Sequence, residues 1–279
     1  MAPRGERLWT QPWFQVEAFA LANLGFLTLD IYLAHSVNSF RRSAEYIPLY
    51  FSAAAPLVLL LALALRSRWI AVWKDLGYLV GWAAILMGLA GVILHLDSSF
   101  FYERTLRSLT YSAPFAAPLA YTGLGFLLLL NRMMDDGTYE WARWVLFLAL
   151  GGFVGNFIFS LTDHAENGFF DGREWIAVTA SALAVGFLIT PLLVPISRRF
   201  IVLCAAMLLL QSLIGVWGVI LHAERNLHGP SVHPLANLVW GAPPMAPLLF
   251  PNLAVLGWIA LWQMWKLTPE REVLQLQGE

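Results

Sequence analysis

The sequence predicts an all-α integral membrane protein with eight transmembrane helices, and three observations lead to this fold class. Hydrophobic residues make up 59% of the 279 residues and charged residues only 13%, about half the charged fraction of a typical soluble domain. The mean hydropathy is +0.64. Apolar runs recur along the whole chain, and each approaches the roughly 20 residues that cross a bilayer as a helix.

Eight apolar runs are the predicted spans, and polar or charged segments separate them. The run at 76–94 contains no charged residue, which makes it the clearest of the eight. The predicted spans are residues 13–33, 49–65, 76–94, 114–130, 141–161, 175–196, 200–221 and 245–265.

Basic residues are divided unequally between the two ends of these spans. Eleven Lys or Arg residues lie on the side that holds both termini, and six lie on the other side. Because Lys and Arg are enriched in cytoplasmic loops, both termini are expected to be cytoplasmic. We expect the protein to be located in a bacterial inner membrane.

Composition and missing motifs exclude several classes of protein. The net charge of −1 provides no basic field for nucleic acid. Cys204 is the only cysteine, so the chain cannot form an internal disulfide or a cysteine-based metal site. Nucleotide-binding glycine loops, zincin helices, nucleophile elbows and haem-attachment motifs do not occur in the sequence. The partner that composition does predict is the lipid bilayer.

The sequence contains an internal repeat. Four segments share one layout, in which an odd-numbered span ends in a histidine, a polar loop follows, and the next span begins with small residues. The histidine and the small residue are separated by 17, 17, 17 and 19 residues. Each segment is therefore predicted to be one helical hairpin. The histidines are His35, His95, His164 and His222, and the small residues are Ser52, Ser112, Ser181 and Gly241.

The two halves of the chain resemble one another more closely than the four hairpins do. His35 and His164 are 129 residues apart, and His95 and His222 are 127 apart. Residues 112–119 (SAPFAAPL) also match residues 241–248 (GAPPMAPL). We therefore expect two pseudo-symmetric four-helix halves, residues 1–136 and 137–279, within one membrane domain. Because each half has an even number of spans, the symmetry axis is expected along the membrane normal.

A few polar side chains interrupt the predicted spans. Asn23, Asn156 and Gln211 are expected to form hydrogen bonds between helices, as amides commonly do in membrane proteins. Glu17 lies near the start of the first span. It is expected to extend toward the cytoplasmic headgroup layer, where water would hydrate its charge.

The repeated histidines are expected at one depth on the non-cytoplasmic face, with carboxylates beside them. Imidazole is the commonest protein metal ligand, and a carboxylate can fix its tautomer through the other ring nitrogen. Residues two apart on a helix diverge by about 200°, so an acid two residues after a histidine can join the site only where the helix ends between them. The predicted metal-site residues are His35, His95, His164, His222, Glu45, Glu174, Asp97, Glu166 and Glu224.

Nitrogen and oxygen ligands without a thiolate favour zinc, iron or copper(II). Such a set could hold a two-metal centre that activates water or oxygen. The alternative cofactor is haem b, with two pairs of helices each holding one haem between two histidines. The position of all four histidines near the surface makes haem the second choice, because a haem buried in a bundle needs ligands deeper in the span.

The leading functional hypothesis is a membrane metalloprotein, an oxidoreductase or hydrolase that acts on a lipid-soluble or periplasmic substrate. The alternatives are a haem-binding electron-transfer subunit, a transporter, and an accessory subunit without a site of its own. Acids gathered at one face argue against a transporter, whose site usually lies at the midplane. Partner membrane subunits or a homo-oligomer are compatible with each alternative. The sequence assigns no catalytic residue.

Overall fold

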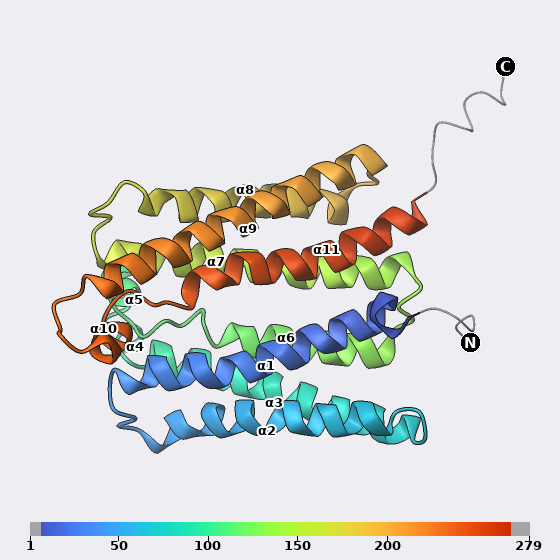
Figure 1. Cartoon of the computed structure of the whole chain (residues 1–279), viewed down its shortest axis with the longest axis horizontal. Helices are drawn as coiled ribbons and strands as arrows, with labels where there is room; N and C mark the ends of the chain where they lie inside the picture. Colours follow the sequence, from blue (N-terminus) through green and yellow to red (C-terminus); the bar gives the residue numbers. More distant parts are fainter. Residues whose placement is uncertain (1–6, 269–279) are drawn as a thin grey trace.

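The computed structural model describes residues 7–268, and within that range the regular structure is entirely helical. The long helices lie side by side along one direction (Figure 1). They are α1 (Pro12–Ser36), α2 (Tyr46–Leu65), α3 (Ile70–Leu96), α6 (Leu119–Met133), α7 (Tyr139–Glu166), α8 (Glu174–Leu193), α9 (Arg198–Leu227) and α11 (Leu249–Leu267). The short ones are η1 (Leu8–Thr10), η2 (Ser43–Glu45), α4 (Phe100–Glu103), α5 (Leu106–Thr110), α10 (Pro234–Trp240) and η3 (Ala246–Leu248).

Within residues 7–268, seven of the long helices are long and apolar enough to cross a membrane, so the chain is a multi-pass membrane protein. The predicted span at 114–130 corresponds to α6, which has only 15 residues. Prolines explain the difference. Pro118 is the N-cap of α6, and residues 115–118 form turns, because a proline supplies no backbone N–H to a helical hydrogen bond.

Large apolar side chains cover the outside of the bundle. Leu57, Leu79, Leu86 and Leu213 are each at least 60% exposed, which would be unfavourable in water. In a bilayer the surrounding solvent is itself apolar, and the helix satisfies every backbone hydrogen bond internally. The outer surface is therefore built for contact with lipid.

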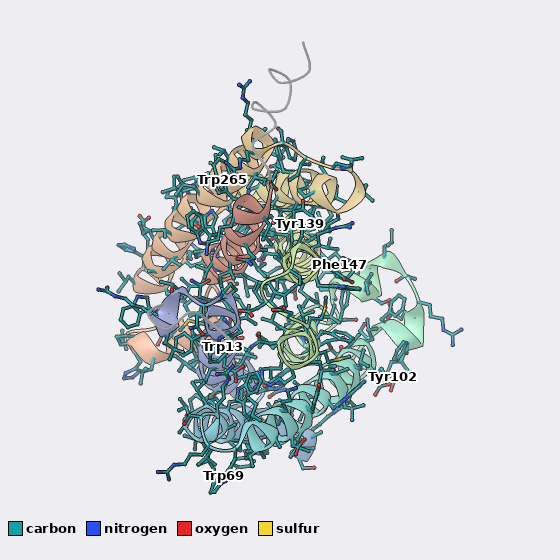
Figure 2. All side chains as sticks on the ribbon, turned by 90° about the vertical axis from the view of Figure 1, so that its right-hand side faces the viewer. Trp13, Trp69, Tyr102, Tyr139, Phe147 and Trp265 are labelled. Atoms are coloured by element: carbon teal, nitrogen blue, oxygen red, sulfur yellow. The ribbon has the colours of Figure 1, made fainter. Side chains whose placement is uncertain are left out.

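The helices pack as two groups of four. In the first half, α1 contacts α2, α2 contacts α3, α3 contacts α6, and α6 contacts α1. In the second half, α7, α8, α9 and α11 make the same cycle of contacts. Viewed from the end at which α1 begins and α11 ends, the first group surrounds the region of Trp13 and the second lies toward Tyr139 and Trp265 (Figure 2). We call this end the terminal face.

Two seams join the groups, one between α6 and α7 and the other between α1 and α11. Asn23 of α1 donates a side-chain hydrogen bond to Asn252 of α11 at 3.1 Å, as expected for an amide between membrane helices. The loop between α6 and α7 ties the same two helices. The Asp136 carboxylate accepts from the Trp13 backbone N–H at 3.0 Å, and its carbonyl accepts from the Gln263 side chain at 3.0 Å.

A buried ion pair lies inside the first half near the terminal face. Both oxygens of Glu17 bind the guanidinium of Arg132, at 2.5 and 2.7 Å, and both side chains are 0% exposed. The expectation that Glu17 extends toward the headgroups is therefore wrong. A partner across the bundle provides the compensating charge, and Arg132 reaches it by packing directly over Gly77 of α3, where a Cβ atom would lie only 1.8 Å from Nε.

Replacing Glu17 by leucine is expected to destabilise the protein by about 3–5 kcal/mol, because Arg132 is then a buried charge without a partner. The double substitution Glu17→Leu/Arg132→Leu removes both charges and should recover most of that loss. Denaturant unfolding of the purified protein in detergent measures the two free energies. A double variant no more stable than the single one would show that the unpaired arginine is not the cause.

Candidate metal sites at the histidine face

The four repeated histidines lie at the same end of the bundle, opposite the terminal face. They occupy the last turns of α1, α3 and α7 and the C-terminal part of α9. This end, which also carries α4, α5 and α10 (Figure 1), is called the histidine face below. The side chains of His35 and His164 are 19% and 17% exposed, so both rings are mostly enclosed by protein.

The structure places these histidines as two pairs, one in each half. The rings of His35 and His95 have their centres 6.2 Å apart, with their planes inclined at 71°. His164 and His222 are close enough to interact electrostatically. Each pair joins the first and third long helices of its half, so the packing of the four-helix group brings the two rings together.

Each ring has a defined partner for Nδ1, and the partners repeat between the halves. Nδ1 of His35 lies 3.5 Å from Oε2 of Glu45, and Nδ1 of His164 lies 3.7 Å from Oε2 of Glu174. Nδ1 of the other two rings is hydrogen-bonded to a proline carbonyl. These distances are 2.9 Å from His95 to Pro114 and 2.7 Å from His222 to Pro243.

The two glutamates are held in the same way. Their side chains are only 12% and 11% exposed, and in each of them Oε2 is buried without a hydrogen-bond partner. A buried carboxylate oxygen without a partner is costly. Since the histidine is the nearest charged or polar group paired with Oε2 in both halves, the two groups form one polar unit.

A tight turn after α1 and another after α7 place the glutamates over the histidines. Ser39 and Phe40 have φ of 58° and 50°, and Gly168 and Phe169 have φ of 72° and 50°. The backbone N–H of Phe40 bonds to the His35 carbonyl at 3.2 Å, and that of Phe169 bonds to the His164 carbonyl at 3.0 Å. Left-handed residues of this kind end helices, and here they reverse the chain within five residues of the histidine.

Aromatic rings complete both turns. Phe40 stacks on Tyr46 with ring centres 4.7 Å apart and lies 5.8 Å from the His35 ring. Phe169 stacks on Trp175 at 4.0 Å and lies 6.2 Å from the His164 ring. Sequence reasoning missed the role of Phe40 and Tyr46, although the repeated Glu-aromatic-Ile string that contains Tyr46 and Trp175 was the available signal.

Charged residues outside the spans hold the loop that carries Glu174. Arg173 forms an ion pair with Asp171 at 2.5 Å. The hydrogen bonds from Arg173 lower the pKa of the Asp171 carboxyl to about 2, so this acid stays ionised throughout the neutral range. The position of Glu174 is thus fixed by an ordered loop as well as by α8.

The loops beside His95 and His222 also match. Ser98 accepts a hydrogen bond from the Ala113 N–H at 2.9 Å, and Asn226 accepts one from the Ala242 N–H at 2.8 Å. These contacts hold the segments that carry the two proline carbonyls. The carbonyls therefore reach their histidines through hydrogen-bonded loops of the same construction.

Three of the sequence-predicted site residues lie elsewhere. Asp97 forms an ion pair with Arg42 at 3.9 Å and is 42% exposed. Glu166 and Glu224 are exposed. Among residues 7–268, no three His, Cys, Asp or Glu side chains are grouped closely enough to form a metal-binding cluster. The structure thus offers two His–His pairs, each with a buried glutamate, in place of one cluster of nine residues.

Comparisons of the chain with protein-family models, with curated proteins and with solved structures found no match. The chemistry of the site therefore depends on its own geometry. The contacts above engage Nδ1 of all four rings, which leaves Nε2 as the nitrogen that can bind a metal ion. A ring held through one nitrogen by a carboxylate or a carbonyl, with the other nitrogen directed to the metal, is the usual arrangement of a histidine ligand.

The two turns differ at one position, and this difference can be tested. A residue other than glycine in the left-handed region costs about 1–2 kcal/mol, and a Cβ atom on Gly168 would meet nothing within 4 Å. Gly168→Ser is therefore expected to lower the free energy of unfolding by that amount, whereas Ser39→Gly should raise it. Denaturant titration of both variants provides the measurement, and shifts of the same sign in the two would contradict the matched geometry.

Proposed function

We propose that each half of this membrane protein binds one transition-metal centre at the histidine face, through Nε2 of its two histidines. The observation that carries the proposal is the repeated anchoring of Nδ1, by Glu45 and Pro114 in the first half. The distance between the rings agrees with it. Two imidazoles that share one metal ion, with bonds of about 2.0–2.1 Å, have ring centres up to about 6 Å apart, and those of His35 and His95 are 6.2 Å apart.

In this proposal the glutamates orient the histidines and do not ligate the metal. Nδ1 and Nε2 lie on opposite edges of the imidazole ring, so a carboxylate beside Nδ1 of His35 faces away from a metal on Nε2. Glu45 and Glu174 then fix the tautomer and raise the basicity of the ligand. The metal, when bound, would supply Lewis-acid or redox chemistry, and we infer an oxidoreductase or hydrolase that acts on a lipid-soluble or periplasmic substrate.

We further propose that the protein crosses the membrane eight times, as two halves related by a duplication. The two cycles of helix contacts support this, and so do the matching left-handed turns at residues 39–40 and 168–169. Close contacts repeat as well. Gly91 packs against Pro118, and Gly218 packs against Pro247, with Gly91 and Gly218 separated by the same 127 residues as His95 and His222.

The excess of Lys and Arg at the terminal face supports a cytoplasmic location for both termini, since positive loops are retained on that side. The histidine face would then lie in the periplasm of a bacterial cell. An external location would let the site receive a periplasmic substrate, and the lipid-facing helices would let it receive one dissolved in the bilayer.

The metal content of the purified protein tests the central proposal. Two metal equivalents per chain are expected. The variant His35→Ala/His95→Ala should lose one of them, and His164→Ala/His222→Ala should lose the other. His228→Ala is the matched control, because its Nδ1 contacts the Glu224 carbonyl of its own helix. Content that is unchanged in both double variants, or equally reduced by the control, would falsify the proposal.

The role of the glutamates has a separate test. Glu45→Gln keeps the size of the side chain but removes the charge beside His35, and should weaken metal affinity about 10–100-fold without changing the stoichiometry at saturating metal. Competition titration with a chelator measures the affinity. Loss of a full equivalent at saturation would instead identify Glu45 as a direct ligand.

A second candidate is haem b, and the pairing of the histidines favours it. Haem iron takes two axial ligands and receives the other four from the porphyrin, so it needs two histidines from each half and no carboxylate. Each half supplies such a pair, and the His35 and His95 ring centres are near the maximum separation for ligation of one metal ion.

An absorption spectrum separates the two candidates. Protein purified from cells supplied with haem is expected to show a Soret band if the centre is haem, with about half its intensity in His35→Ala/His95→Ala. Stoichiometric zinc, iron or copper without a Soret band would instead support the metal-ion centre. Expression in haem-deficient cells is the control for adventitious pigment.

A further inference from the structure

We infer that the terminal face of the first half contains a binding site for a phosphate group, formed by Arg66 where it stacks on Trp13 and Trp73. The guanidinium carbon of Arg66 lies 3.7 Å from the centre of the Trp13 ring and 4.9 Å from that of Trp73. The two indoles contact each other edge to face, with ring centres 5.9 Å apart. Arg66 directly follows α2, so the site lies at the end of the bundle.

Arg66 is a charged group without a countercharge of its own. Among residues 7–268 the structure gives it no ion-pair partner, and its Nε is buried without a hydrogen bond. The neighbouring acids are already engaged, since both oxygens of Glu17 bind Arg132 and an oxygen of Asp136 accepts from the Trp13 backbone. Burial and the charge of Arg132 lower the pKa of Arg66, as expected where a cation lacks a full partner.

Two further donors in the same cluster are buried and unpartnered. Trp73 and Arg132 are each only 4% exposed, and Nε1 of Trp73 and Nε of Arg132 have no hydrogen-bond partner. The guanidinium of Arg132 also lies on the Trp73 ring, 4.4 Å from its centre. Three N–H groups around one indole thus lack an acceptor. Buried donors normally have one, so an acceptor with several oxygen atoms is the missing group.

The fold does not require this cluster. This step rests on the duplication proposed above, although the site itself does not depend on the metal centres. The equivalents of Arg66, Trp73 and Arg132 are Pro195, Phe200 and Leu261, and Leu261 belongs to the apolar core of the second half. Since that half packs the same four-helix cycle without these polar groups, their presence in the first half indicates a binding role.

Phosphate is the acceptor that this chemistry recognises. A guanidinium that stacks on aromatic rings keeps its planar set of N–H groups free, and this set matches the paired oxygens of a phosphate. Two sources supply such a group at a membrane surface, namely a phospholipid headgroup and free inorganic phosphate. Arg66 lies at the end of a lipid-facing helix, which places it at the level of the headgroups.

Thermal unfolding of the full-length protein in detergent tests the site and separates the sources. Phosphatidylglycerol, diacylglycerol and inorganic phosphate are added separately, with diacylglycerol as the lipid that lacks a phosphate. We expect phosphatidylglycerol to raise the melting temperature and diacylglycerol to have no effect. A shift with inorganic phosphate at the same site would identify the source as free phosphate, and a shift with phosphatidylglycerol alone would identify it as the headgroup.

Variants locate the effect. Arg66→Gln should weaken phosphatidylglycerol binding by about tenfold or more, and Arg66→Lys, which keeps the charge but loses the planar fork, should weaken it to a smaller degree. Trp73→Phe removes only the Nε1 donor and should also weaken binding. The exposed Arg68 is the matched control, so Arg68→Gln should bind as the wild type does.

Two results would overturn the inference. Equal losses in Arg66→Gln and Arg68→Gln would show only general attraction between a basic surface and an anionic lipid. Absence of a shift with either phosphate compound would show that the unpartnered donors bind water. If Arg66→Gln does not fold, the comparison of Arg66→Lys with Arg68→Lys decides between the same outcomes.

Discussion

The bilayer sets the constraint on which the rest of the structure depends. Without water in the membrane interior, the backbone can satisfy its hydrogen bonds only within helices, so irregular structure and polar chemistry move to the ends of the bundle. Both polar regions described above follow this rule. The histidine pairs occupy the last turns of α1, α3, α7 and α9, and Arg66 lies just beyond the end of α2. Charge is found deeper only where a partner accompanies it, as Arg132 accompanies Glu17.

Small residues let the helices approach closely enough for these contacts. Gly77 admits the Arg132 side chain, and Gly91 and Gly218 admit Pro118 and Pro247. The proline contacts bring the segments before α6 and α11 against α3 and α9, and those segments carry the carbonyls that hold His95 and His222. The positions of the imidazoles are thus determined by backbone packing as well as by the loops.

Local patterns made much of the fold predictable. Apolar runs located seven helices that are able to span, and the repeat located the histidines and the glutamates ten residues after two of them. Contacts between distant segments could not be predicted. Glu17 and Arg132 are 115 residues apart, and the bond from His95 goes to a backbone carbonyl, which no side-chain pattern reveals. Asp97, Glu166 and Glu224 share a spacing with the histidines but extend from helix ends in other directions. Spacing along a chain therefore identified candidates, and only packing could select among them.

The loop between α6 and α7 has one consequence for the assembly of the chain. Through Asp136 this loop holds the beginning of α1 and also the last helix, α11. The midpoint of the polypeptide thereby fastens its two ends. Neither half can complete its own border until the other has been synthesised, because the first helix obtains its capping carboxylate from the connection and the connection is secured by the last helix. A protein made of two similar halves is in this way closed into a single cooperative unit, and its final fastening must wait for the end of translation.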